Sequence, residues 1–578
     1  MKKIYGFAAL SAAMLLASCS NDNEPNGLTP AADQGSCYFK VNIAAPLEST
    51  RAAEYGKVDE SEYAVATVDF IVFDEAGTVM ACIPSTQFTF EDQDAEADNS
   101  VANNISSLSK TITVEVTKDA ERKVGSVIAV LNSPGISYTS GTTLATVRKD
   151  LLTYKTKKLK KVDGEFKEDA SGTEYYVMTN SAYNVSGAPA YATDLKGHVY
   201  ETDELAESDA TPIYVERVAA RVDLKKGDEF PTTVTEGIAK GKDENGNEVT
   251  FSVALKKVEV IYEPTKAHLV KDIDGISGFD GWDESVYKFR THWANQPSLT
   301  FLSQAEETST SKSDYRKVLI SDATLSEDWK TTGATFYLNE NVSETYPTYV
   351  VLTGKIQVNG ADAEVMRLYQ NGTYYTGNGA LKQLCTYLGW DDYKYIYTAT
   401  TEGESDFISS VEVSDVALTQ TTGECYGYIK MNATKKVNVD GSEKVAVLCK
   451  NGVPVTAANA NSYNLGLVKD TNDNVIAYQT SEATGKKYMA YVYGSGDTYY
   501  YTEIKAEEVG KIGVIRNHLY KITFNQISGI GTPLYDPSDE LIPHNVTTQD
   551  GEPNWFFGAS INIINWHVYS QGMNFSNN

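Results

Sequence analysis

Short strand signals separated by tight-turn signals are the feature that most constrains the fold of this chain. Runs of apolar and β-branched residues recur along it, at 65–73, 110–117, 126–131, 254–262, 348–358, 444–449, 488–493 and 519–527. Between such runs stand Asn245-Gly246, Asn371-Gly372, Asp440-Gly441 and Asn451-Gly452. Asn, Asp and Gly supply the positive φ angles that tight hairpins need. Helical signals are few, at 381–388 and 54–66, so the pattern predicts an all-β protein built of β-sandwiches.

The composition narrows the class of function. The formal net charge is -28 and the sequence pI is about 4.7, which argues against nucleic-acid binding, since that needs a basic face to meet phosphates. The hydrophobic content of 41% is enough for packed cores. With 578 residues, the chain has room for several domains, and the Lys- and Pro-containing stretch 225–237 is a plausible boundary between two of them.

The N-terminus has the form of a secretory signal. Lys2 and Lys3 precede an apolar stretch, 4–17, that is too short to span a bilayer as a helix. It ends in Leu16-Ala17-Ser18-Cys19, which resembles a bacterial lipobox, where cleavage precedes a Cys that receives lipid. We therefore expect a signal peptide over 1–18, a lipidated Cys19, and a flexible tether over 20–35; the alternative is an ordinary signal peptide that contains a Cys.

The tether leads into an alternating segment with one apolar face. Its odd positions are apolar throughout: Cys37, Phe39, Val41, Ile43, Ala45 and Leu47. A period of two predicts a β-strand that buries one face. Arg51 follows it in the sequence Ser-Thr-Arg-Ala-Ala, ahead of Ala52.

The C-terminus carries a second unusual strand pattern after a polar linker at 536–553. Its apolar positions are Ile561, Ile563, Ile564, Trp566, Val568, Tyr569, Met573 and Phe575. The alternation changes phase after Ile563, which indicates a bulge or a change of packing partner. An apolar strand on a terminal linker risks aggregation, unless it is meant to pair with another molecule.

These two ends suggest one mechanism. A cut after Arg51 would remove the 37–47 strand and open a groove lined by its apolar partners. Burying one large apolar side chain contributes roughly 1.5–3 kcal/mol, so refilling the groove could favour association by on the order of 10 kcal/mol before entropy costs. The C-terminal strand of a neighbouring copy is the candidate to fill it, and such a head-to-tail contact makes a linear polymer.

Other kinds of site find little support. The cysteines Cys385, Cys425 and Cys449 could form a disulfide or remain buried thiols, and no spacing of Cys or His matches a metal site. Acidic loops at 272–275 and 470–474 resemble calcium loops only loosely. Tyr499-Tyr-Tyr501 could stack on sugars, or pack a sheet face. We expect no catalytic residue, no metal and no cofactor, and therefore no enzyme.

The residues together resemble a known family. The resemblance rests on the lipobox, the alternating strand, Ser-Thr-Arg-Ala-Ala and a terminal strand that runs through Trp566-His-Val-Tyr-Ser-Gln571. Internal phrases match too, such as Tyr214-Val-Glu-Arg-Val-Ala-Ala-Arg and Ile515-Arg-Asn-His-Leu-Tyr. They resemble the type V pilins of Bacteroidales-type bacteria, in particular the shaft subunit of the short (minor) fimbriae.

The resemblance implies two transthyretin-like β-sandwich domains whose terminal strands serve donor-strand exchange. The expected organisation is 1–18 signal peptide, 19–51 propeptide, 52–225 N-terminal domain, 226–545 C-terminal domain and 546–578 donor-strand segment. It implies an outer-membrane lipoprotein precursor, cleavage between Arg51 and Ala52 by an arginine-specific protease, and polymerisation into a cell-surface fimbrium. The implied partners are further copies of the chain, anchor and tip subunits, and host or bacterial surface receptors.

Two other functions compete with a fimbrial subunit. A glycan-binding surface lipoprotein of a nutrient-uptake system would keep the lipidated Cys19 on the mature chain. A glycosidase or protease would need a catalytic motif, and the sequence offers none.

Overall fold

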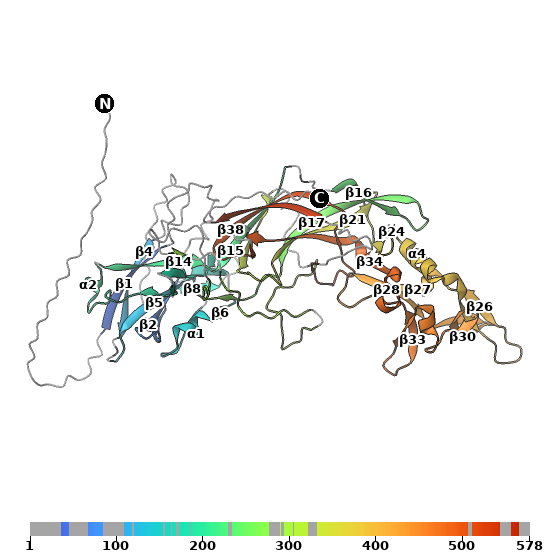
Figure 1. Ribbon diagram of the computed structural model, residues 1–578, viewed down its shortest axis with the longest axis horizontal. Coiled ribbons are helices and arrows are strands. Elements are labelled where there is room, and N and C mark those ends of the chain that lie inside the picture. Colours follow the sequence, from blue (N-terminus) through green and yellow to red (C-terminus); the bar gives the residue numbers. More distant parts are fainter. Residues whose placement is uncertain are drawn as a thin grey trace, which may run out of the picture.

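The computed structural model describes residues 36–44, 67–84, 109–543 and 556–565. Short gaps within the third range fall at 118, 120, 134, 154–155, 163–164, 169–172, 186–187, 208, 229, 231–233, 277–288, 291–293, 304–305, 322–331 and 507–510. Strands dominate this part of the chain, and the predicted all-β class is confirmed. The sheets follow one another along an elongated molecule (Figure 1).

The N-terminal sheet lies at one end of the molecule (Figure 1). Its strands, in spatial order, are β3 (Val79–Ile83), β2 (Val68–Asp74), β5 (Val124–Leu131), β10 (Met178–Asn180), β14 (Ala210–Arg217), β1 (Ser36–Ala44) and β4 (Ser109–Thr117), with β13 (Thr193–Asp194) on β5. All seven residues of β2 are buried, because neighbouring side chains alternate between two cores on opposite faces of the sheet. Phe70 and Val72 pack in one core, and Ile71 and Phe73 in the other.

Two sheets form the middle of the molecule and enclose a large core that includes Val222, Leu352 and Phe524. The smaller has the order β20 (Ala334–Asn339), β15 (Ala219–Lys226), β38 (His518–Ser528), β40 (Phe556–Asn565). The larger has the order β32 (Gly466–Lys469), β33 (Val475–Gln479), β28 (Tyr426–Asn432), β34 (Met489–Tyr493), β23 (Val365–Leu368), β24 (Tyr374–Thr376), β16 (Val234–Lys242), β17 (Glu248–Ile261), β21 (Tyr349–Val358), β35 (Asp497–Glu503), β39 (Thr532–Pro533), with β22 (Ala361–Asp362) on β21 and β27 (Val416–Gln420) on β28.

The opposite end of the molecule is formed by a segment inserted between β24 and β34 (Figure 1). It contains the helix α4 (Gly379–Leu388) and a sheet that we call the tip sheet. The tip sheet has the order β26 (Phe407–Ser410), β25 (Tyr393–Tyr397), β30 (Ser442–Lys450), β29 (Thr434–Val439), with β31 (Val453–Pro454) on β30. The helix predicted at 381–388 is confirmed by α4, which ends at Gly389 in the left-handed conformation (φ 75°).

The remaining elements are small. The short sheets are β12 (Ala188–Ala190), β11 (Tyr183–Val185), β19 (Phe289–Arg290); β18 (Ala267–His268), β6 (Leu151–Leu152); β36 (Lys505–Ala506), β37 (Lys511–Ile512); and β8 (Glu165–Glu168), β7 (Thr156–Val162), β9 (Thr173–Tyr176). The other helices are α1 (Leu144–Arg148) and α2 (Asp203–Glu207), with 3₁₀ turns at Trp390–Asp392, Val413–Asp415, Ala460–Tyr463, Glu482–Thr484, Lys486–Tyr488 and Gly494–Gly496. No helix in the described ranges is long and apolar enough to cross a membrane.

Two of the four predicted turns have a positive φ at both residues, whereas at Asn245-Gly246 and Asn371-Gly372 only the glycine does. Asp440 and Gly441 have φ angles of 51° and 79°, and Asn451 and Gly452 have 50° and 78°. Two successive positive φ angles are what a two-residue hairpin of type I′ requires. These turns join β29 to β30 and β30 to β31, so they set the register of the tip sheet.

Candidate functional site: two terminal strands and the joint between their sheets

The predicted strand near the N-terminus is β1, and it lies inside the N-terminal sheet. It pairs in parallel with β14, from Lys40 opposite Ala210 to Ala44 opposite Tyr214, and antiparallel with β4 along its whole length. Within the described part of this sheet, β4 has no strand neighbour other than β1. Taking β1 away would therefore leave a slot between β14 and β4, with unpaired backbone groups on both sides.

The alternation predicted for this strand is confirmed where its side chains are described. Phe39 and Val41 are fully buried and Cys37 is 9% exposed, whereas Tyr38 and Lys40 are half-buried. Phe39 also meets Phe70 of β2 edge-on, with ring centroids 6.5 Å apart. Ile43 lies in β1, and Ala45, Leu47, Cys19, Arg51 and Ala52 lie outside the described residues.

A loop and a short helix hold β1 from outside the sheet. The backbones of Tyr38 and Tyr200 exchange two hydrogen bonds, of 2.8 and 2.7 Å. The side chains of Tyr200 and His198 both bond to Asp209, and these hydrogen bonds, from Tyr200 first, lower the pKa of that carboxyl. The helix α2, just beyond this loop, lies against both β1 and β4 (Figure 1).

The C-terminal strand is β40, at the edge of the smaller middle sheet. It pairs antiparallel with β38 of the same chain, where Ile561 and Ile563 stand opposite the buried Ile522 and Tyr520. Ile564 lies opposite Leu519, and pairing runs unbroken through the expected phase change. The irregularity in register falls earlier, between the partners of Ala559 and Gly558, so no bulge separates Ile563 from Ile564 in this pairing.

The other residues of the predicted donor strand, Trp566, Val568, Tyr569, Met573 and Phe575, lie outside the described residues. As an edge strand, β40 can leave β38 without breaking any pairing in the interior of the sheet.

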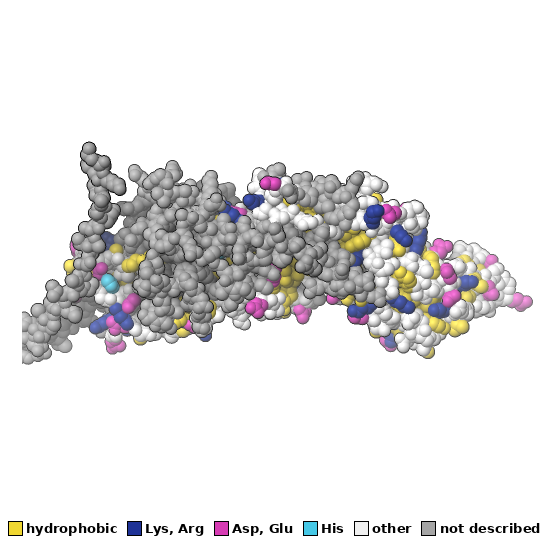
Figure 2. Space-filling model, turned by 45° about the horizontal axis from the view of Figure 1, so that its top comes forward, with side chains coloured by type: hydrophobic (Ala, Val, Ile, Leu, Met, Phe, Trp, Pro, Cys, Tyr) yellow, Lys and Arg dark blue, Asp and Glu magenta, His cyan; other side chains and the backbone are white. Residues whose placement is uncertain are grey.

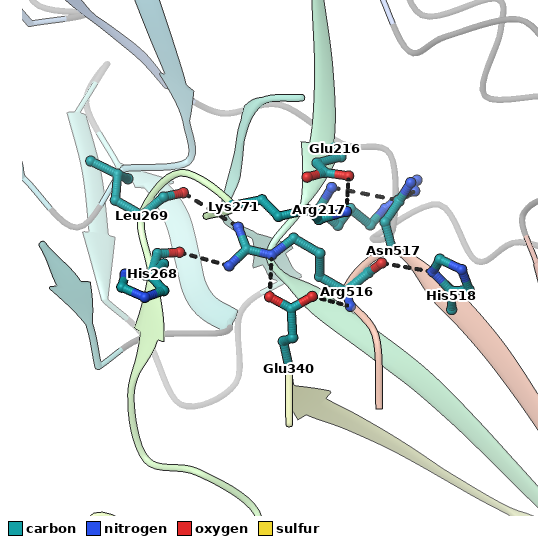
Figure 3. A network of polar contacts seen from close by, with 9 residues as sticks. All are labelled: Glu216, Arg217, His268, Leu269, Lys271, Glu340, Arg516, Asn517 and His518. Carbon is teal, nitrogen blue, oxygen red and sulfur yellow. Dashed lines mark hydrogen bonds and ion pairs between the residues drawn. The ribbon is translucent and has the colours of Figure 1, made fainter. Parts of the chain in front are cut away.

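A buried polar network joins the sheets that hold these two strands (Figure 3). The chain passes from β14 to β15 through Val218 alone, and so crosses from the N-terminal sheet to the middle sheet within one residue. On the β14 side, Glu216 accepts a hydrogen bond from the Nζ of Lys271 at 3.0 Å, and both side chains are at most 1% exposed. Arg217 donates from Nη1 to the Oδ1 of Asn517 at 3.1 Å.

Arg516 connects the network to the start of β38. Its Nε donates to Glu340, just after β20, at 3.0 Å, and its Nη2 donates to the backbone oxygen of His268 at 2.8 Å. Asn517 has a φ of 59°, a left-handed conformation that asparagine tolerates, and its N–H bonds to Ala219 at the start of β15. The network therefore ties the neighbour of β1 to the neighbour of β40.

Burial sets the protonation of one member of this network. Desolvation lowers the pKa of His268, and the positive charge of Arg516 lowers it further. His268 is 8% exposed, so its neutral form is the one that fits the joint.

The structure distinguishes between the disulfide and the buried thiols that the cysteine spacing left open. Cys385, Cys425 and Cys449 are buried and form no disulfide, which agrees with the interpretation as buried thiols, and Cys37 is buried as well. Burial raises the pKa of Cys385 to about 12, so this thiol is unreactive at neutral pH.

The loosely calcium-like loops have other partners. Asp272 and Asp274 pair with Arg148, at 3.2 and 2.8 Å, and Asp470 caps its own turn by accepting from the backbone N–H groups of Asn472 and Asn474. In the described part of the chain, no group of His, Cys, Asp and Glu side chains could hold a metal ion. Tyr499 and Tyr500 are buried in the sheet, and Tyr501 packs edge-on against Tyr349.

Comparison with known proteins finds a family match in the C-terminal part of the chain. Residues 487–572 match the family described as Major fimbrial subunit protein type IV, Fimbrillin, C-terminal. The chain is therefore similar to fimbrillins over this C-terminal segment. The matched range holds β34, β35, β38 and β40, so the fimbrillin segment contains the C-terminal strand and the strand on which it is seated. The predicted resemblance to Bacteroidales pilins is thereby confirmed.

Solved structures with similarity include further proteins of this kind. A cell adhesion protein from Parabacteroides distasonis shares 12% identity over 92% of this chain and 98% of its own, with a TM-score of 0.34. A fimbrilin from Porphyromonas gingivalis shares 12% over 86% and 92%, with a TM-score of 0.29. The tip fimbrial protein Mfa3 from the same organism shares 11% over 85% and 95%, with a TM-score of 0.23. No curated protein matches the chain.

Proposed function

We propose that this fimbrillin relative is a shaft subunit of a cell-surface fimbrium that polymerises by donor-strand exchange after proteolysis. The observation that carries the proposal is the position of β1, hydrogen-bonded on both sides and buried through Cys37, Phe39 and Val41. Arg51 follows this strand in the sequence, so a cut there would leave β1 held by non-covalent contacts alone.

Cleavage and exchange would then proceed as one sequence of events. Release of β1 opens the slot between β14 and β4, and the C-terminal strand of a second copy fills it. The edge position of β40 supports this role. The slot and the donor lie on different sheets of one chain, so the contact repeats head to tail and forms a fibre.

The organisation of the precursor follows from the same proposal. Lipidated Cys19 and the tether up to Arg51 deliver the chain to the outer membrane, and an arginine-specific protease removes them. We place the boundary between the two proposed sandwich domains at Val218 instead of residue 225, and the pairing of β15 with β20 and β38 supports this choice. Anchor and tip subunits would begin and end the fibre, and surface receptors of host or bacterial cells would be its adhesion partners.

Treatment of the purified precursor with an arginine-specific protease tests the proposal. We expect a mature chain that begins at Ala52, and ladders on unheated SDS gels that disappear on boiling. Arg51→Lys is the matched control, since it keeps the positive charge while resisting this protease, and it should stay monomeric.

A second variant tests the donor. Deletion of 561–578 should leave the circular dichroism of the monomer β-rich and abolish the ladder. A cleaved wild-type chain that stays monomeric would refute the proposal, and ladders from the truncated chain would refute a C-terminal donor.

The glycan-binding alternative gains no support from the tyrosines that suggested it. Tyr499 and Tyr500 are 0% and 2% exposed, and their hydroxyls bond to the backbone of Ile542 and Gly529. Such side chains pack the sheet and present no face to a sugar ring.

A further inference from the structure

Exposed large aliphatic side chains gather at one end of the molecule. Of the described residues, Leu205, Ile408, Val445, Val447, Val453, Leu467 and Ile476 are large, hydrophobic and exposed. All except Leu205 belong to the segment that forms the end with the tip sheet (Figure 1). Hydrophobic side chains also show among charged ones on this end in the space-filling view (Figure 2).

Three of these side chains, together with the half-buried Ile396, form one surface on the outer face of the tip sheet. Ile396 of β25 stands directly opposite Ile408 of β26 on one side and Val447 of β30 on the other. Val445 lies two residues from Val447, and therefore on the same face. Ile408, Val445 and Val447 are 61%, 53% and 40% exposed, and we call these four residues the tip patch.

The other face of the same sheet is an ordinary core. Tyr393, Tyr395, Ala446 and Leu448 are at most 1% exposed and pack with α4 and β28. An antiparallel sheet with one buried face usually places polar side chains on the other. A contiguous aliphatic surface in that position marks a contact with another molecule.

Lysines flank the tip patch. Lys394, two residues before Ile396 on β25, shares its face and is exposed. Lys436 of β29 stands opposite Val445 and is also exposed, where it pairs with Glu443. The tip patch is thus an apolar surface bordered by two lysines, one of which is paired with Glu443, on a chain whose net charge is -28.

The opposite end of the molecule carries the complementary combination. Leu205 of α2 is 55% exposed, and the two residues before it, Asp203 and Glu204, are exposed acids. The next residue, Ala206, is fully buried and fixes this short helix against β1 and β4. An apolar side chain with an acidic border therefore lies beside the slot that the donor strand is proposed to fill.

We infer that the tip patch docks on α2 of the next copy of this chain in the fibre. The contact would bury the exposed Leu205 against Ile408 and Val447 and bring Lys394 and Lys436 to Asp203 and Glu204. It is heterologous, so it repeats along a head-to-tail polymer without closing. The inference rests on the proposed donor-strand polymer and adds to it a second contact between successive subunits.

Cysteine cross-linking tests the geometry of this contact. A chain that carries both Leu205→Cys and Ile408→Cys is cleaved, allowed to polymerise, oxidised, and boiled in SDS without reductant. We expect a covalent ladder that collapses to monomer when reductant is added. Leu205→Cys with Leu467→Cys, an exposed position on β32 outside the tip sheet, is the matched control and should give no ladder.

Charge-reversal variants test the charged residues around the two surfaces. Lys394→Glu with Lys436→Glu should slow elongation about tenfold, because charges at the rim of an interface act mainly on the association rate. Adding Asp203→Lys and Glu204→Lys to the same chain should restore the rate, which a merely structural effect of the first pair would not allow.

The outcomes separate this contact from the proposed function. Wild-type ladders on unheated gels without cross-linking of the double-cysteine chain would overturn the docking contact alone. Cross-linked dimers from Ile408→Cys by itself would overturn it in favour of a contact between two tip patches. Absence of any wild-type ladder after complete cleavage would overturn both.

Discussion

At the scale of single residues, the polar network between the N-terminal and middle sheets contains a buried ion pair of Lys271 and Glu216. The two side chains are 1% and 0% exposed and lie 3.0 Å apart. Two charges this deep lose their hydration, and each depends on the other for compensation. The pair therefore specifies how the segment at 271 meets the end of β14, more than it contributes net stability.

Replacing one member of the pair should be costly. We expect Lys271→Met to lower the free energy of unfolding by about 3–5 kcal/mol, because it removes the cation that lies 3.0 Å from the buried Glu216 carboxylate. Lys271→Met with Glu216→Leu should recover most of the loss. Urea denaturation of the uncleaved chain measures both.

A matched control comes from an exposed ion pair of similar length. The side chains of Lys240 and Glu248 lie 2.8 Å apart, and they are 66% and 68% exposed. Lys240→Met should leave the unfolding midpoint unchanged. Equal effects of Lys240→Met and Lys271→Met would contradict the role given to burial.

At the scale of elements, the sequence predicted strands well and their partners poorly. The strands β17, β21, β34 and β38 lie where apolar runs indicated them, because local alternation and turn residues determine where a strand begins and ends. The exit from the N-terminal sheet at Val218 had no such signal, since 214–224 reads as one uninterrupted strand-like segment.

Of the two proposed functional surfaces, the sequence predicted the buried face of β1 but not the tip patch. Cys37, Phe39 and Val41 could be predicted as one buried face, because the alternation in β1 contrasts apolar with polar residues. The tip patch could not, because Val445 and Val447 alternate with Ala446 and Leu448, and both faces of β30 are apolar. The pairing of Arg516 with Glu340 joins residues 176 positions apart, and no local pattern announces it.

Retention of β1 after cleavage should depend on its buried face. We expect Phe39→Ala to weaken binding of the severed strand by about 3–5 kcal/mol, because Phe39 is fully buried against Phe70. The excised peptide should leave faster and polymerisation should begin sooner. Mass spectrometry of the nicked precursor after gel filtration follows the retained peptide.

Tyr38 offers the comparison on the half-buried face of the same strand. Tyr38→Ala removes an aromatic side chain next to Phe39 and should affect retention much less. Identical release rates for the two variants would show that the apolar face does not hold the strand.

At the scale of the whole molecule, contacts between the N-terminal sheet and the middle sheets hold these two parts together as one rigid unit. The segment that follows β17 returns to the N-terminal sheet, where Ala267, Leu269, Val270 and Ile273 complete the core beneath it. Together with the network around Arg516, these contacts leave little freedom for one part to swing against the other.

His268 should make the stability of this unit depend on pH. Its pKa in the folded chain lies below the ordinary 6.5, from burial first and then from Arg516 and Arg148, with Asp272 and Glu340 acting in the opposite direction. The unfolded chain therefore binds a proton that the folded chain resists, and stability falls as the pH drops below about 6.5.

Denaturation midpoints at pH 7.5 and 5.5 check this expectation. The wild-type chain should be less stable at pH 5.5, and His268→Gln should reduce the difference. Carboxyls such as Asp74 keep their charge throughout this pH range. The pKa of Asp74 is about 2, because hydrogen bonds from Thr78 and Arg122 lower it more than burial raises it. An unchanged difference in His268→Gln would assign the pH dependence to other groups.

The parallel and antiparallel pairing on the two sides of β1 has a mechanical consequence. A strand that replaced β1 between β14 and β4 would bear a pull along its own axis as a shear force. In that direction the backbone hydrogen bonds of both edges bear the load together, whereas peeling from one end would break them in turn. A chain of subunits linked through this slot would therefore resist drag on an attached cell at every junction, with no covalent bond between one subunit and the next.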